Sequence, residues 1–195
     1  MSVKDELITI VSGLPRSGTS MMMSMIAAGG IPPLVDGKRT ADKDNPKGYY
    51  EFEPVKHTAK DASWVDQAGG KVVKVIHTLL LSLPLDRRYR VVFMLRDLSE
   101  VVRSQDEMLR RSGKPSSPHA NEQIKAFYAA QLDQVKQFLK DKDCFEVLYV
   151  PYGEIIESSG RWVDAVNLFL GESLDVDAMR AVVDPTLYRQ RAQTP

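Results

Sequence analysis

The stretch VSGLPRSGTS, residues 11–20, constrains the fold more than any other part of the chain. An apolar run from Leu7 to Val11 leads into Gly13, and four residues separate Gly13 from Gly18. This spacing is typical of a phosphate-binding loop between a buried strand and a helix, where backbone N–H groups and the helix dipole converge on an anion. The sequence therefore predicts an anion site directly after the first strand.

The loop lacks the lysine that nucleotide hydrolases and kinases carry at its end. Thr19 and Ser20 follow Gly18 directly, and the nearest positive charge is Arg16, inside the loop. Hydroxyl groups in a first helical turn can donate to phosphate oxygens, and a guanidinium can bind a phosphate through two hydrogen bonds. No acidic partner for magnesium is evident at the end of a neighbouring strand. The pattern favours phosphate binding without a metal over its structural alternative, a glycine-rich turn that binds nothing.

Strand-like and helix-like segments alternate along the chain, which predicts parallel strands joined by crossover helices. Nearly continuous apolar runs, typical of strands buried on both faces, lie at 7–13, 71–77, 90–96 and 145–150. Helices are expected at 18–28, 54–68, 97–112, 121–141, 160–170 and 175–183. Asp97 and Glu100 form a capping-box pattern, and Gly171 is expected to end a helix. We predict a three-layer α/β fold with about four or five parallel strands flanked by helices.

Length and charge narrow the classes of function. A chain of 195 residues with 43% hydrophobic residues fits one domain over 1–195. Lys and Arg (26) balance Asp and Glu (26), so no overall field attracts nucleic acid or an anionic membrane. No apolar stretch reaches membrane-spanning length, no signal segment is evident, and a single cysteine suits a reducing cytoplasm. The polar segments 36–48 and 112–123 are candidates for lids or substrate loops, or plain surface loops.

Two motifs carry a family resemblance. LPRSGTS resembles the 5′-phosphosulfate loop of sulfotransferases, Pro-Lys/Arg-Ser-Gly-Thr-Thr/Ser after the first strand. RDLSEVVRS resembles the family's 3′-phosphate-binding motif, with Arg96 at a strand end and Ser104 eight residues later. NPKGYYE and VPYGEII also resemble segments of the compact bacterial members. Leu98 stands where the family commonly has proline, Met21 stands where it usually has tryptophan, and its glycine-rich C-terminal donor clamp is not visible.

The resemblance implies a P-loop NTPase-like fold and a sulfuryl donor, 3′-phosphoadenosine 5′-phosphosulfate (PAPS), used without a metal. It assigns Arg16 to the 5′-phosphate and the bridging oxygen, and it assigns Arg96 and Ser104 to the 3′-phosphate. The rest of the implied cradle is Ser17, Gly18, Thr19 and Ser20. The acceptor would be a small molecule or a glycan that offers a hydroxyl or an amine.

The general base has two candidates. Family members with a histidine base carry Lys-Thr-His at the end of the second strand, and here Lys74 and His77 occupy that region with one extra residue between them. Other members use a glutamate, for which Glu51 or Glu53 is the candidate. A core histidine bonded to backbone is the structural alternative for His77. Besides a sulfotransferase, a P-loop kinase of a small metabolite and a non-catalytic nucleotide-binding module remain open.

Overall fold

The computed structural model describes residues 7–38, 48–111, 113 and 118–188. Its centre is a four-stranded parallel sheet with the spatial order β2-β1-β3-β4. The strands are β1 (Ile8–Gly13), β2 (Val72–Lys74), β3 (Tyr89–Leu95) and β4 (Phe145–Pro151). This sheet, with helices on both faces, confirms the predicted α/β class.

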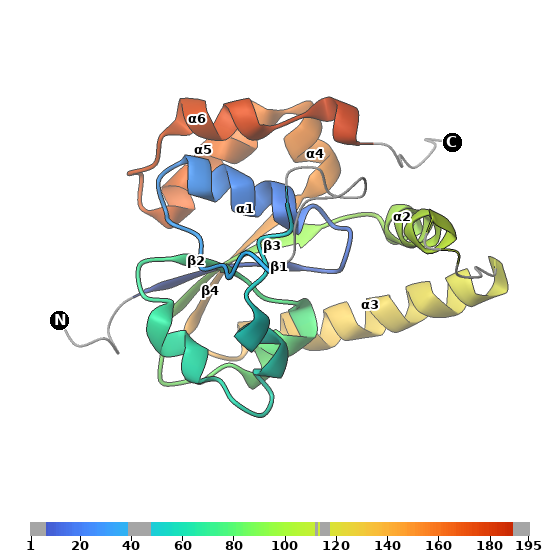
Figure 1. Ribbon diagram of the computed structural model, residues 1–195, viewed down its shortest axis with the longest axis horizontal. Coiled ribbons are helices and arrows are strands. Elements are labelled where there is room, and N and C mark those ends of the chain that lie inside the picture. Colours follow the sequence, from blue (N-terminus) through green and yellow to red (C-terminus); the bar gives the residue numbers. More distant parts are fainter. Residues whose placement is uncertain (1–6, 39–47, 112, 114–117, 189–195) are drawn as a thin grey trace.

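Helices cover the sheet on both faces (Figure 1). One layer contains α1 (Thr19–Ala28), α4 (Tyr152–Glu157), α5 (Ser159–Leu170) and α6 (Val176–Val182), which share one buried cluster with the sheet. The other layer contains the long helix α3 (Pro118–Lys140) and the 3₁₀ helices η2 (Glu53–His57), η3 (Ser63–Gln67) and η4 (His77–Ser82). Helix α2 (Leu98–Arg111) lies beside the carboxyl end of β3, and η5 (Pro185–Leu187) follows α6.

Alternation along the strands explains the two cores. Successive side chains of a strand point to opposite faces, so strands covered on both faces must be apolar at nearly every position. On β1, Ile10 belongs to the cluster under α3 and Val11 to the cluster under α1. Met22, Met23 and Met25 of α1 are fully buried in that second cluster. The methionine run is therefore core packing between α1 and the sheet.

The predicted helix at 54–68 is wrong, because this segment forms η2 and η3 instead. The Thr58 hydroxyl donates to the carbonyl of Val55, and the same hydroxyl accepts from the indole N–H of Trp64. The Asp61 carboxylate then accepts from the Ser63 amide. Side chains that bond to nearby backbone compete with the helical pattern, so the segment breaks into two short turns.

The second strand is shorter than predicted. It ends at Lys74, and its last bond to the sheet runs from the Val75 amide to the Val11 carbonyl. β2 is the edge strand of the sheet, where it pairs with β1 and forms a single parallel bridge between Val72 and Pro33 on its outer side. Neither partner continues the pairing beyond Lys74, so the chain leaves the sheet and enters η4 at His77. The expectation that His77 ends a strand is therefore wrong.

The two candidate loops lie partly outside the described residues, which omit 39–47, 112 and 114–117. Within the second loop, the structure begins α3 at Pro118, so residues 118–123 are helical and not loop. The short helix α4 is an addition to the predicted elements.

Candidate functional site

The loop between β1 and α1 is built around two glycines with positive φ. Gly13 has φ +147°, and a Cβ there would lie 2.7 Å from the Met94 carbonyl oxygen. Gly18 has φ +95° and is the N-cap of α1; a Cβ there would lie 2.3 Å from Cδ2 of Tyr152. Both positions therefore need glycine for conformation and for space.

The end of this loop presents backbone donors. Gly18 has no side chain that could cap α1, so the first-turn N–H groups, including those of Thr19 and Ser20, lie at an N-terminus suited to an anion. Thr19 and Ser20 are both half-buried. The amide and the hydroxyl of Ser17, another residue of the implied cradle, both donate to the Leu14 carbonyl, at 3.2 and 2.7 Å. The Ser17 side chain therefore closes the loop from inside.

Arg16 joins the two motifs that the sequence singled out. It has φ 69°, an uncommon conformation for a residue other than glycine. Its Nε donates to Oγ of Ser104 at 3.0 Å, and Ser104 on α2 is 8% exposed. The carboxyl ends of β1 and β3 are adjacent in the sheet, with Gly13 beside Met94, so the elements that follow them meet. The structure thus brings Arg16 and Ser104 together across 88 positions of sequence.

Arg96, which follows β3, lies under the same loop. Its Nη1 donates to the Arg16 carbonyl at 2.9 Å, and its Nε donates to Oε2 of Glu100 at 2.8 Å. The side chains of Arg96 and Glu100 are 8% and 4% exposed, so this is a buried ion pair. Asp97 does cap α2, since its carboxylate accepts from the amides of Ser99 and Glu100. Glu100 does not complete the predicted capping box in this way; its carboxylate pairs with Arg96.

His77 lies at the start of η4, beside the loop between β1 and α1, and is 3% exposed. Its Nε2 is 3.1 Å from Oε1 of Gln131 on α3. Burial lowers the pKa of His77, while hydrogen bonding to Gln131 and to the Gly13 backbone acts to raise it. The Gly13 contact is looser than an ideal hydrogen bond, because Nδ1 meets no partner of full hydrogen-bond geometry among the described residues. The ring is held close to the loop and favours its neutral form.

Glu51 lies two residues before η2. Its carboxylate is 3.6 Å from the Lys56 ammonium, and its carbonyl accepts from the Asp36 amide. The segment is tied to the end of β2, because the Lys74 ammonium donates to the Tyr49 carbonyl. These contacts place Glu51 at the β2 edge of the sheet. Glu53, which begins η2, pairs with Lys56 at 2.8 Å and is half-buried.

Comparison with known proteins identifies the family of the chain. A model of the sulfotransferase domain matches residues 8–191. The chain belongs to the sulfotransferase domain family. No curated protein sequence matches it significantly.

Solved structures agree with the fold of this sulfotransferase domain. The sulfotransferase domain of the Synechococcus PCC 7002 olefin synthase superposes with a TM-score of 0.57 at 14% identity, over 98% of this chain and 90% of that one. The sulfotransferase domain from the curacin biosynthetic pathway gives 0.52 at 12% identity, over 97% and 93%. At these identities the likeness concerns the fold, which is P-loop NTPase-like.

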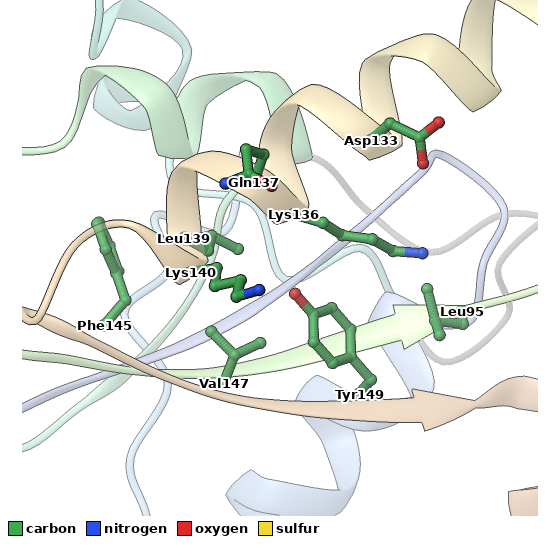
Figure 2. A pocket seen from close by; sticks show the side chains of 9 residues that line it. All are labelled: Leu95, Asp133, Lys136, Gln137, Leu139, Lys140, Phe145, Val147 and Tyr149. Atoms are coloured by element: carbon green, nitrogen blue, oxygen red, sulfur yellow. The ribbon is translucent and has the colours of Figure 1, made fainter.

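A groove of about 820 Å³ lies on the α3 face of the sulfotransferase domain (Figure 2). Its lining combines apolar side chains with polar ones from α3, and Lys136 and Lys140 reach from that helix toward Tyr149 on β4. Leu95, which directly precedes Arg96, also lines it. Helix α3 thus contributes both to this groove and, through Gln131, to the contact with His77.

The described part of the sulfotransferase domain contains no group of three or more His, Cys, Asp or Glu side chains placed to hold a metal ion. In the same residues, no helix combines the length and the apolar character needed to cross a membrane.

Proposed function

We propose that this sulfotransferase domain transfers a sulfuryl group from PAPS to a hydroxyl or amine of a small-molecule or glycan acceptor, without a metal. The contact between Arg16 and Ser104 supports this most directly, because it joins the loop after β1 to the helix after β3. In the sheet order β2-β1-β3-β4, the chain adds β2 on one side of β1 and β3 on the other. Open α/β sheets bind ligands at such a switch point, which here lies between β1 and β3. We also place the activity in the reducing cytoplasm, which suits a chain with one cysteine.

The residues around the loop match the charges of the donor. The first-turn N–H groups of α1, with the Thr19 and Ser20 hydroxyls, suit a 5′-phosphate. Arg16 is proposed to neutralise the charge that develops on the leaving phosphate oxygen. Arg96 and Ser104 are proposed to hold the 3′-phosphate, which distinguishes this donor from a simple 5′-nucleotide. A sulfuryl group carries less charge than a γ-phosphoryl group, so the missing lysine fits this reaction.

The reaction conserves charge and atoms in a single displacement. A lone pair of the acceptor oxygen or nitrogen forms a bond to sulfur while the bond from sulfur to the phosphate oxygen breaks. The acceptor proton passes to a base, and adenosine 3′,5′-bisphosphate leaves. By analogy with phosphoryl transfer, a loose transition state leaves the protein with positioning and electrostatic stabilisation as its main contributions.

His77 is proposed as the base, with Glu51 as the alternative. The lowered pKa of His77 keeps its imidazole neutral near pH 7, the form that accepts a proton, and its ring lies beside the loop. The Gln131 contact at Nε2 and the burial of Nδ1 mean that an acceptor must displace a covering group to reach either ring nitrogen.

Isothermal titration calorimetry tests the donor assignment. Adenosine 3′,5′-bisphosphate with a chelator should bind, and more tightly than ATP with magnesium. Arg16→Ala should weaken this binding by roughly 1–3 kcal/mol, because it removes charge-assisted hydrogen bonds. Arg88→Ala is the matched control, since it removes an exposed arginine that precedes the amino end of β3.

Two results would contradict the proposal. A preference for ATP with magnesium would favour the kinase alternative. Nucleotide binding without transfer of label from donor to any acceptor in a broad screen would favour a binding module.

A further inference from the structure

The site contains a buried acid that the proposed transfer does not use. Glu100 lies in the first turn of α2 and is 3% exposed. Its Oε2 accepts from Nε of Arg96 at 2.8 Å, and its Oε1 accepts from the Tyr188 hydroxyl at 2.7 Å. A negative charge near a phosphate-binding loop repels an anionic ligand. The place of Glu100 therefore implies a role that outweighs this repulsion.

Glu100 reaches the loop through Arg96. The guanidinium that Glu100 holds by Nε donates through Nη1 to the Arg16 carbonyl at 2.9 Å. Arg16 has a φ of 69°, a left-handed conformation that persists only when its surroundings impose it. The buried pair of Arg96 and Glu100 thus holds a hydrogen-bond donor at the carbonyl of Arg16, the residue of the loop with the left-handed backbone.

Two tyrosines complete this support. Cζ of Arg96 lies 4.6 Å from the ring centre of Tyr152 and 5.3 Å from that of Tyr188. The two rings meet edge to face, with centres 5.1 Å apart and planes at 81°. The Tyr152 ring also occupies the space that a Cβ of Gly18 would need. The loop is therefore supported at Arg16 and at Gly18 by one connected group of side chains.

We propose that Glu100 and Tyr188 are positioning residues, which hold the phosphate loop in its ligand-binding shape by fixing Arg96. Tyr188 follows η5, so the C-terminal segment is part of the site although it lies 88 positions from Glu100. Burial, with the hydrogen bond to Glu100, raises the pKa of Tyr188 to about 12, so its hydroxyl remains a donor at neutral pH. The inference rests on the proposed function only for the identity of the ligand.

The experiment uses Glu100→Gln and Tyr188→Phe, with Glu107→Gln as the control. Glu107 lies on the same helix and pairs with the surface residues Arg110 and Arg111. Removing a negative charge without any change of shape should tighten the binding of adenosine 3′,5′-bisphosphate, and Glu107→Gln measures that effect. Positioning by Glu100 predicts the opposite sign, with binding at least tenfold weaker in Glu100→Gln. Tyr188→Phe keeps the ring and the charges, and should weaken binding several-fold.

Amide hydrogen exchange in the nucleotide-free protein gives a second readout that needs no ligand. The amides of residues 16–20 should exchange faster in Glu100→Gln and Tyr188→Phe than in the parent or in Glu107→Gln. If the parent binds no adenosine 3′,5′-bisphosphate, the proposed function fails. The exchange rates then still test whether Glu100 and Tyr188 hold the loop. Tyr188→Phe carries the test if Glu100→Gln does not fold. Unchanged loop exchange, or binding as tight as that of the parent, in a folded variant would overturn the inference.

Discussion

Replacing Gly18 by alanine tests the geometry of the loop most sharply. The new Cβ would lie 2.3 Å from Cδ2 and 2.7 Å from Cε2 of Tyr152, whereas carbon atoms in contact are about 3.5–4.0 Å apart. Two terms oppose the substitution. A left-handed conformation costs a residue with a Cβ about 1–2 kcal/mol, and overpacking against a buried ring adds about 1–3 kcal/mol. We therefore expect Gly18→Ala to lower the free energy of unfolding by about 2–5 kcal/mol.

Gly30→Ala provides a matched control. Gly30 also has a left-handed φ, +114°, but within the described residues nothing lies within 4 Å of the Cβ that alanine would add. This variant should show only the backbone term, about 1–2 kcal/mol. Urea unfolding followed by circular dichroism measures both variants against the parent, and the difference between them isolates the contact with Tyr152.

A third variant tests whether that ring is the obstacle. In a Tyr152→Leu background the aromatic ring is gone, so Gly18→Ala should be less destabilising than in the parent. The two substitutions should therefore be non-additive, as expected for residues in contact. Equal losses of stability in Gly18→Ala and Gly30→Ala, or full additivity with Tyr152→Leu, would refute the packing described between α4 and the loop.

His77 supports two further predictions. If its imidazole accepts the acceptor proton, His77→Ala should lower sulfuryl transfer by roughly 10²–10⁴-fold in a labelled-donor assay; full turnover in this variant with loss in Glu51→Ala would make the glutamate the base. Because burial lowers the pKa of His77 below its ordinary 6.5, the folded state favours the neutral ring. That contribution to stability is present above about pH 6.5 and is lost as the pH falls through the folded pKa. The free energy of unfolding from urea titrations should thus fall more steeply below about pH 6.5 in the parent than in His77→Gln, and equal slopes would contradict the assignment.

Local patterns in the sequence determined the frame of the site. The glycine spacing of the loop and the apolar runs of β1, β3 and β4 depend on neighbouring residues, so they could be read without a structure. The C-terminal glycine signal at Gly171 likewise ends α5 as expected, with φ 111°. The length of the edge strand β2 was overestimated, because a run of apolar residues does not show where the neighbouring strand stops pairing.

Only the tertiary structure decided which side chains meet at the loop. Asp97 and Glu100 match a local capping pattern, yet the Glu100 carboxylate pairs with Arg96, four positions earlier, whose guanidinium the fold buries against the carbonyl of Arg16. Tyr188 reaches Glu100, and Gln131 reaches His77, across 88 and 54 positions. Such contacts depend on the order of strands in the sheet and on how helices pack over it. The spacing of two residues along the chain does not say whether they will touch. Their distance in space is fixed only when the sheet and its helix layers assemble.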